Sequence, residues 1–432
     1  MVTVDIFNMS EDVWPFIQAI SDEGVREREI DENASLGDRE IWCLREGEAV
    51  AICPRPVAAE FIKYAEEIRG DRVQVWVPEV RNGLICQSII GDERFRERLG
   101  FLGRKHGGIN LVSYCVSKGF YNLVRALRSE GVEVATPEAP EEKDGWVVDN
   151  FGSKSGIRQW GVEMAPGVVC RSVNTAIKAA KEKLRAGKGV VIKTNKAHSG
   201  MGVLIVRKEE AEGAEKKIAE ELAKNDYWKL FPLVVEEWIE AEEKIGGGFP
   251  SGEMVVRKTG ETEFLYSCGM RVTRKGEFAG MEIGAGVLPG EVEKKIEETV
   301  RWLGKKYAAK GYRGYFDVDF VAGKSGKLYV TESNVRRTGG THVFILAQKL
   351  YGRDFQKKIF VVSNNWREMG RVMSWGEVIS RLEPVRWDKQ KNKGVVIMEE
   401  RTLKLGRLAY VIFEEDRKTA ERTEERMGEL LA

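Results

Sequence analysis

Long apolar stretches are absent from this sequence of 432 residues. No run approaches the roughly 18 consecutive apolar residues of a membrane-spanning helix. The first residues, MVTVDIFNMSEDVW, also lack the basic and apolar regions of a signal peptide. These absences argue against secretion and against insertion into a membrane, so we expect a cytoplasmic protein with no membrane partner.

Paired cysteines and an excess of one charge are missing as well. The six cysteines form no CxxC pair and no cluster with the three histidines, which argues against a disulfide scaffold or a zinc module. Buried free thiols are the simpler interpretation. The 69 Lys and Arg residues balance 68 Asp and Glu residues, which excludes a basic nucleic-acid coat protein and an acidic tail protein. We expect no nucleic-acid partner.

Proline is scarce, whereas glycine is abundant. With 11 Pro against 46 Gly, the glycine excess is not that of a low-complexity chain. Eleven of the glycines fall within 245–290, about twice the share that an even spread would give. Glycine permits close approach of the backbone and unusual φ angles. The positions of the glycines therefore indicate where the backbone approaches another group.

Apolar runs and helical patterns alternate over the first 150 residues, which is typical of an α/β layer with parallel strands. A polar, turn-rich stretch at 141–160 predicts a domain boundary. Beyond it, helices predicted at 172–186 and 291–310 alternate with strands. We therefore expect three parts: an α/β domain at 1–150, an α+β domain at 151–350, and a C-terminal extension at 351–432 that packs back on the core.

Two familiar phosphate-binding motifs are not present. Gly323-Lys324-Ser325 resembles the end of a Walker A loop, but Val318 stands where that loop needs its first glycine. The segment is better explained as a hairpin turn. Gly200 and Gly202 follow a strand, yet Ile205 stands where a Rossmann GxGxxG motif needs its third glycine.

A strand predicted at 190–193 ends in Lys193 and leads into a glycine-rich loop. Such a loop can lay backbone N–H groups over phosphates, and a neighbouring lysine supplies a positive charge. The alternative is an exposed hairpin with a solvated lysine.

The strand predicted at 233–239 carries Glu236 and Glu237 just before Trp238. An apolar strand that runs into carboxylates suits an adenine slot, because the backbone of a hinge can read the edge of the base. The same pattern also fits an ordinary edge strand, which can carry such charges.

Four oxygen-bearing side chains lie on two neighbouring predicted strands. The two-residue period of a strand places Asp317 and Asp319 on one face, and Glu332 and Asn334 on one face of the next strand. A short hairpin at 323–327 makes the two strands neighbours, so the ligands converge. Acids gathered in this way require a cation, and ligands that are all oxygens favour Mg²⁺ shared with nucleotide phosphates. The alternative is a solvated acidic hairpin.

A glycine-rich turn directly follows these acids and enters a predicted helix. It reads RRTGGTH at 336–342. Backbone donors at the start of a helix, together with Arg336, form an anion site. The sequence therefore places a cation site and an anion site side by side.

Taken in order, these elements resemble the ATP-grasp superfamily over roughly 150–350. The order is Lys154, Lys193 with its glycine loop, the Glu-bearing hinge, Asp319, Glu332-x-Asn334 and Arg336. Within the superfamily, ESNVRRTGGTH at 332–342 and SKSGIRQWGVEMAPGVV at 153–169 resemble the pheganomycin-type peptide ligases. That resemblance implies an N-terminal α/β pre-ATP-grasp domain followed by a two-lobed α+β ATP-grasp fold, with a lid at about 190–235.

The resemblance also implies roles for individual residues. ATP would be bound by Lys154, Lys193, Ser199, Gly200, Gly202, Glu236, Trp238 and, at the ribose, Glu243. One or two Mg²⁺ ions, or Mn²⁺ in their place, would be held by Asp319, Glu332 and Asn334, with Asp317 as an auxiliary acid. Arg336 and Lys193 would act on the transferred phosphoryl group. Substrate contacts are expected from the glycine-rich wall at 245–290 and from the glycine-rich turn at 336–342, which we call the anion turn. The expected residues are Arg257, Arg271, Arg274, Gly339, Gly340 and Thr341.

The predicted activity is that of an ATP-dependent carboxylate–amine ligase. ATP would phosphorylate a substrate carboxylate, and an amine would then attack the acyl phosphate to leave a peptide-like amide, ADP and phosphate. The substrates would be small-molecule or peptide carboxylates and amines, and the superfamily resemblance suggests a homodimer. A small-molecule kinase and a non-catalytic nucleotide-sensing module are the alternatives. Whether His198 or His342 contacts a ligand stays open.

Overall fold

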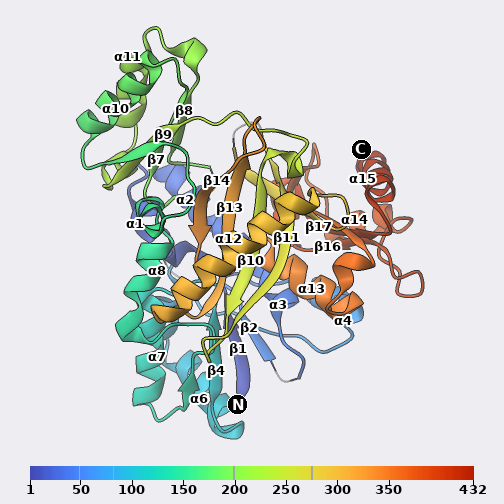
Figure 1. The fold of residues 1–432 in the computed structure, drawn as a ribbon. Coiled ribbons are helices and arrows are strands. Elements are labelled where there is room, and N and C mark those ends of the chain that lie inside the picture. Colours follow the sequence, from blue (N-terminus) through green and yellow to red (C-terminus); the bar gives the residue numbers. More distant parts are fainter. Residues whose placement is uncertain (48, 81, 198–199, 274–275) are drawn as a thin grey trace.

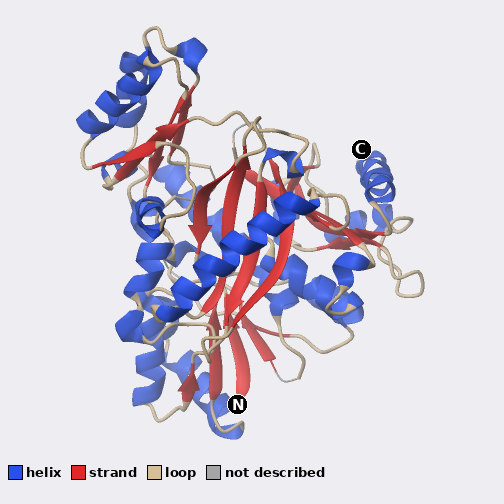
Figure 2. Cartoon of the chain, in the orientation of Figure 1, coloured by secondary structure: helices blue, strands red, loops and turns tan. Residues whose placement is uncertain are grey.

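A computed structural model describes residues 1–47, 49–80, 82–197, 200–273 and 276–432. Three β-sheets with flanking helices make up the chain (Figures 1 and 2). Among these residues, no helix is both long enough and apolar enough to cross a membrane. All six cysteines are buried and unpaired, which confirms the prediction of free thiols.

The first sheet consists of five parallel strands in the order β3-β2-β1-β4-β5. All residues of the central strand β1 are buried, as expected where helices connect parallel strands. This arrangement confirms the predicted N-terminal α/β layer. The strands are β1 (Val2–Ile6), β2 (Ala49–Ile52), β3 (Gln74–Trp76), β4 (Ile109–Ser113) and β5 (Val134–Ala135). The helices are α1 (Trp14–Gln18), α2 (Glu23–Ser35), α3 (Glu40–Cys43), α4 (Ala59–Arg69), α5 (Ile85–Gly91), α6 (Glu93–Lys105) and α7 (Lys118–Ser129).

A small four-stranded sheet, in the order β6-β9-β7-β8, forms the lobe at the upper left of Figure 1. Helix α10 begins after Ser172, whose hydroxyl accepts a hydrogen bond from the Thr175 N–H in a capping box. Two helices, α8 (Trp146–Phe151) and α9 (Lys154–Ile157), precede the lobe. The elements of the lobe are β6 (Gly167–Cys170), α10 (Val173–Arg185), β7 (Val190–Thr194), β8 (Val203–Val206), α11 (Ala214–Ala223) and β9 (Leu233–Glu237). The lobe therefore begins at β6, earlier in the chain than the lid predicted at about 190–235.

The largest sheet has eight strands in the order β14-β13-β10-β11-β12-β15-β17-β16. Neighbouring strands run antiparallel, and α12 (Gly290–Ala309) lies diagonally across β10 and β11 (Figure 1). Five of the strands belong to the middle of the chain: β10 (Pro250–Val256), β11 (Thr262–Val272), β12 (Phe278–Ile283), β13 (Gly314–Ala322) and β14 (Leu328–Asn334). Helix α13 (Thr341–Tyr351) follows β14.

The C-terminal extension completes this largest sheet. Its three strands, β15 (Phe360–Glu368), β16 (Gly394–Ile397) and β17 (Arg407–Glu414), continue the sheet from the edge of β12. They are joined by α14 (Trp375–Leu382) and followed by α15 (Arg417–Leu431).

Buried ion pairs join the N-terminal domain to the rest of the chain. The Arg337 guanidinium lies 2.9 Å from the Asp5 carboxylate and 3.1 Å from that of Glu138, and it also pairs with Glu40. All four side chains are at least nine-tenths buried. We call this group the Arg337 cluster. It sits immediately after the residues that carry the candidate metal ligands, so it fixes their position relative to the N-terminal domain.

A second contact between the N-terminal domain and the C-terminal extension contains a group that titrates, the Asp38 carboxyl. Asp38 is buried and accepts hydrogen bonds from the N–H groups of Glu400 and Arg401, and burial raises its pKa from 3.8 to about 7. The folded state therefore binds the Asp38 proton more tightly than the unfolded state, so stability falls as pH rises through the window between these values. We expect the free energy of unfolding to fall between pH 5 and pH 8, with roughly 2 kcal/mol of that change due to Asp38.

The measurement is denaturant unfolding of the wild type and of Asp38→Asn at both pH values. The variant should lose that part of the pH dependence, since it cannot ionise. Asp226→Asn, which changes an exposed aspartate, is the matched control and should retain the wild-type pH dependence. An Asp38→Asn variant whose stability falls by the wild-type amount would contradict the expectation.

Candidate active site

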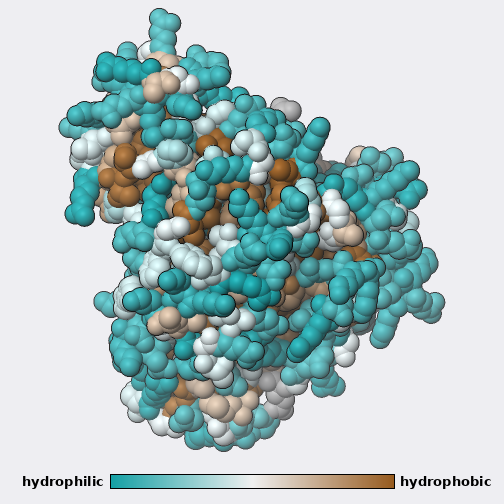
Figure 3. All heavy atoms as spheres, viewed as in Figure 1, coloured by the Kyte–Doolittle hydropathy of each residue, from teal (hydrophilic) through white to brown (hydrophobic). Residues whose placement is uncertain are grey.

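Most of the predicted site residues, though not Gly202, meet at a cavity of about 790 Å³ between the small lobe, the largest sheet and the N-terminal domain, and the further exceptions are described below. Figure 3 shows apolar side chains (brown) where the lobe at the upper left meets the body of the molecule. Strands β10 to β12 contribute a wall of the cavity from the glycine-rich segment 245–290. The predicted residues that line it are Lys154, Lys193, Gly200, Glu236, Trp238, Asp319, Glu332, Asn334, Arg336, Gly339 and Gly340.

The acidic hairpin has the predicted geometry. In the pairing of β13 with β14, Asp317 lies opposite Asn334 and Asp319 lies opposite Glu332. The Asn334 amide nitrogen donates to Asp317 at 2.9 Å and to Asp319 at 3.1 Å. The turn that connects the strands contains Gly323-Lys324-Ser325, which confirms that this string is a hairpin and not a Walker A loop.

The charges of the hairpin are not balanced. Burial raises the pKa of Asp317 to about 7, with a further contribution from the charge of Glu253, and burial also raises that of Asp319. Asp319 Oδ1 is buried and has no hydrogen-bond partner in the described part of the chain. In contrast, Lys154, 2.7 Å from Glu332, lowers the pKa of Glu332 to about 2. A buried carboxylate oxygen without a donor is a position that a cation would satisfy.

A divalent cation therefore fits the chemistry of these residues, although they are not yet arranged around one. Among the described residues, no group of three or more His, Cys, Asp or Glu side chains is placed to hold a metal ion. Glu332 is turned toward Lys154, and Asn334 presents its amide nitrogen to the acids. Binding would require Asn334 to present its carbonyl oxygen and Glu332 to exchange the lysine for the cation.

Lys193, at the end of β7, is buried and forms an ion pair with Glu236 of β9. The two strands are hydrogen-bonded neighbours, which brings the lysine and the glutamate to the same side of the small sheet. Arg158 pairs with the second oxygen of Glu236. Glu236 is therefore paired with two cationic side chains, Lys193 and Arg158, and does not face an open adenine slot.

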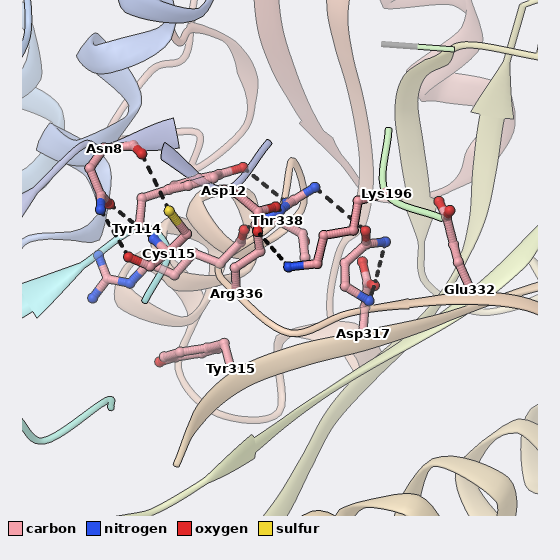
Figure 4. A network of polar contacts seen from close by, with 12 residues as sticks. Asn8, Asp12, Tyr114, Cys115, Lys196, Tyr315, Asp317, Glu332, Arg336 and Thr338 are labelled. Atoms are coloured by element: carbon pink, nitrogen blue, oxygen red, sulfur yellow. Dashed lines mark hydrogen bonds and ion pairs between the residues drawn. The ribbon is translucent and has the colours of Figure 1, made fainter. Parts of the chain in front are cut away.

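Arg336 is held by the N-terminal domain. Its Nε lies 2.9 Å from Asp12, and its terminal nitrogen donates to the Tyr114 hydroxyl at 3.3 Å. Asp12 also lies 3.9 Å from Lys196 of the glycine-rich loop, so one carboxylate touches both cations (Figure 4). Because Asn334 accepts a 3.5 Å hydrogen bond from Arg336, this network reaches the acidic hairpin. Sequence reasoning found Arg336 but gave no signal for Asp12, which lies 324 positions away.

The hinge differs from the prediction in two respects. The Trp238 N–H donates to the Gly189 carbonyl at 2.9 Å, so this backbone donor is already used, although Trp238 lines the cavity. Glu243 is exposed and does not line the cavity. After Ala241 the chain turns into a short helical segment at Gly246–Gly248 and carries Glu243 outward. This corrects the expectation that Glu243 binds the ribose.

Two arginines expected at the substrate also lie elsewhere. Arg257 follows β10 and pairs with the partly exposed Glu263 across the turn to β11. Arg271 points to α15, where it makes two hydrogen bonds of 2.6 and 3.0 Å to Glu424. Neither arginine lines the cavity. Arg257 lies in the turn beyond the end of β10. Arg271 lies on the other side of the sheet, because alternate residues of a strand face opposite sides, and its neighbours Met270 and Val272 line the cavity instead.

The anion turn is partly as predicted. Gly339 and Gly340 line the cavity, and a Cβ on Gly340 would lie 2.2 Å from the Tyr266 hydroxyl, so the backbone approach here requires glycine. Thr341 does not line the cavity, because its hydroxyl donates to the buried Glu253 behind the wall. His342 is buried as well, and burial lowers its pKa well below 6.5. These findings remove Thr341 and His342 from the ligand contacts.

The glycine-rich loop closes the cavity on the side of the small lobe. Gly200 and Gly202 both have positive φ angles, of 74° and 70°. A Cβ on Gly200 would come within 2.7 Å of Glu277, so the loop packs against the turn before β12. Ser199, His198 and Arg274, which the sequence analysis also named, lie outside the described residues.

Residues that the sequence did not single out complete the cavity. They come from α2 and the turn after it, from the end of β4, and from β15 and β17 of the C-terminal extension. No local motif marked them, because the signal is only their shared position after folding. They include Asn33, Arg39, Tyr114, Asn365, Trp366, Glu368 and Arg407.

Comparison with known proteins agrees with this geometry. Residues 37–129 match a family model described as the pre-ATP-grasp domain. An L-propargylglycine–L-glutamate ligase of Streptantibioticus cattleyicolor is 28% identical over 245 residues. The match spans 50% of this chain and 47% of that protein, so the chain spans about half the length of this curated relative.

Solved structures resemble nearly the whole chain. A biotin carboxylase of Campylobacter jejuni has a TM-score of 0.57 and 12% identity, and covers 99% of this chain and 94% of its own. The biotin carboxylase domain of a Hydrogenobacter thermophilus 2-oxoglutarate carboxylase, solved with MgADP and bicarbonate, has a TM-score of 0.54 and 15% identity, with coverage of 98% and 89%. An N5-carboxyaminoimidazole synthetase of Staphylococcus aureus, solved with ADP, has a TM-score of 0.53 and 13% identity, with coverage of 100% and 97%. At these identities the likeness shows the fold alone.

Proposed function

We propose that this chain, which has the ATP-grasp fold and carries a pre-ATP-grasp domain at 37–129, is an ATP-dependent carboxylate–amine ligase. The observation that supports the proposal is the convergence of two buried lysines, an acidic hairpin and Arg336 on one cavity. Lysines suit phosphates, the hairpin suits a divalent cation, and arginine suits an anion that develops charge during the reaction.

ATP is proposed to bind between the small lobe and the largest sheet. Lys154 and Lys193 would exchange their partners, Glu332 and Glu236, for the phosphates. Backbone N–H groups of the loop at Gly200 and Gly202 would lie over the phosphates. The adenine would lie against Trp238, and the Ile239 N–H would read its edge, since this N–H has no hydrogen-bond acceptor among the described residues.

Mg²⁺ would be held by Asp319, Glu332 and Asn334, and it would neutralise charge on the phosphates. The substrate carboxylate attacks the γ-phosphorus, and the bond from that phosphorus to the bridging oxygen breaks to release ADP. Arg336 orients the carboxylate and stabilises the charge of the acyl phosphate. An amine then attacks the acyl carbon, loses a proton and expels phosphate. Catalysis in this scheme comes from positioning and charge neutralisation, with no covalent enzyme intermediate.

The substrates are proposed to be of amino-acid size. The name of the S. cattleyicolor relative couples two amino acids, and the cavity of about 790 Å³ has room for ATP and a small second molecule. We also propose a homodimer, as the superfamily resemblance suggests, which light scattering of the purified protein will test.

The test is an ADP-release assay with a panel of carboxylic acids, with and without hydroxylamine. A ligase that forms an acyl phosphate should give a hydroxamate and ADP in equal amounts, because hydroxylamine replaces the amine. ADP formation without hydroxamate, on a hydroxyl acceptor, would support the kinase alternative and contradict the proposal. Binding of ATP with no ADP release across a broad panel of acids and amines would support a nucleotide-sensing module.

A further inference from the structure

One helical face of the N-terminal domain forms part of the cavity. Five residues at three- and four-residue spacings, from α2 into the following 3₁₀ turn (Leu36–Arg39), line the cavity: Glu29, Glu32, Asn33, Leu36 and Arg39. Such spacing places side chains on one side of a helix. The proposed ATP and metal residues lie on other walls, so this face has no role in the mechanism above.

Arg39 is buried on this face with unused donors. Its side chain is 7% exposed, and its Nε pairs with Glu399 of the C-terminal extension. No hydrogen bond or ion pair joins its two terminal nitrogens to any described residue. Because Glu399 already balances the charge of Arg39, the free part of the guanidinium is suited to donating two parallel hydrogen bonds.

Asn33 adds a further unused donor. It is 1% exposed, it lines the cavity, and its amide nitrogen is buried with no hydrogen-bond partner among the described residues. Buried donors are nearly always paired in folded proteins. Arg39 and Asn33 therefore both have unpaired N–H donors, which a carboxylate can accept.

This donor group lines the same cavity as the proposed site of phosphoryl transfer. Arg336 donates a hydrogen bond to the Tyr114 hydroxyl at 3.3 Å. Tyr114 lines the cavity together with Arg39 and Asn33, and so do Gly339 and Gly340 of the anion turn.

Building on the proposed ligase function, we propose that Arg39 and Asn33 bind a carboxylate of the substrate that does not react. Arg336, beside the acidic hairpin, is the arginine placed for the carboxylate that is phosphorylated. Arg39 is paired with Glu399, and no hydrogen bond or ion pair joins it to the described residues of the hairpin, so it suits a group whose charge stays constant. The substrate is therefore a dicarboxylic acid or an amino acid. It is bound by the carboxylate that does not react.

Two measurements test the site. The first needs no turnover: the melting temperature of the wild type is followed with glutarate and glycine as probes, against glutaramide, glycinamide and NaCl as controls. We expect glutarate, glycine or both to stabilise the protein more than their amides do. The probe that binds distinguishes the acid from the amine substrate. Equal effects of acids, amides and NaCl would overturn the proposal.

The second measurement compares variants in the ADP-release assay. Arg39→Met/Glu399→Gln removes both charges together, so no unpaired buried charge is left. We expect it to raise KM for the acid-bearing substrate about 10- to 100-fold, with a smaller effect on kcat and no effect on KM for ATP. Asn33→Leu, which changes no charge, should raise the same KM about 5- to 10-fold. Arg257→Met, outside the cavity, is the matched control.

The two proposals can fail separately. If the wild type releases no ADP but the probe binds and both Arg39 and Asn33 variants lose it, the ligase function is wrong and the carboxylate site stands. If ADP is released and neither variant changes KM or probe binding, the carboxylate site is wrong and the ligase function stands.

Discussion

Replacement of Glu332 by glutamine should lower the rate of ADP release by about 100-fold or more, a loss of roughly 3 kcal/mol of transition-state stabilisation. Glu332 is the acid of the hairpin that is fully ionised, because Lys154 lowers its pKa to about 2. Glutamine has nearly the same shape but no charge, so the proposed Mg²⁺ site loses an anionic ligand and Lys154 loses its counter-ion. The rate should be measured at saturating ATP over a range of Mg²⁺ concentrations.

Two controls make this result specific. Glu263→Gln changes an exposed glutamate that pairs with Arg257 away from the cavity, and it should leave the rate unchanged. A melting curve of Glu332→Gln should resemble that of the wild type, which would exclude unfolding as the cause. Near-normal activity of Glu332→Gln would contradict the metal assignment. A deficit that saturating Mg²⁺ partly restores would support it.

Replacement of Arg337 by methionine should lower the free energy of unfolding by about 3–5 kcal/mol. The guanidinium is the shared partner of Asp5, Glu40 and Glu138, and all of these carboxylates are buried. Methionine fills much of the volume but leaves buried acids without a counter-ion. Burial raises the pKa of Glu40 to about 7 even with Arg337 present, which shows how little solvation these acids receive. Urea denaturation measures the effect.

The double variant Arg337→Met/Glu40→Gln should recover part of the loss, since it removes one of the unpaired charges. Arg257→Met breaks a partly exposed ion pair and should cost no more than about 1 kcal/mol. A single Arg337→Met variant as stable as the wild type would show that the Arg337 cluster does not join the domains.

The acidic hairpin shows what the sequence could predict. Strand periodicity and a short turn require few assumptions, because both are local. They correctly placed Asp317 and Asp319 opposite Asn334 and Glu332. The capped helix at 172–186 was predicted for the same reason, since Ser172 and Gly187 mark its ends in the chain itself.

The rest of the site depends on contacts between distant segments. Arg336 meets Asp12 across 324 positions, and Arg39 meets Glu399 across 360. No pattern in a single sequence links such pairs. For the substrate wall, the family resemblance indicated the segment of the chain but did not indicate which side of the sheet each residue faces. Arg271 therefore fell on the side of the sheet that meets Glu424, one residue away from the side that faces the cavity.

The order of strands in the largest sheet has a consequence for how the protein is made. Strand β17 emerges from the ribosome after β15 and β16, yet it lies between them in the sheet. The partner of Arg39, Glu399, precedes it by only a few residues. A nascent chain can therefore form its N-terminal parallel sheet early, but the proposed carboxylate site can assemble only after Glu399 has been synthesised. Before β17 emerges, the outer edge of β15 lacks this neighbouring strand, and such an open edge can pair with another chain.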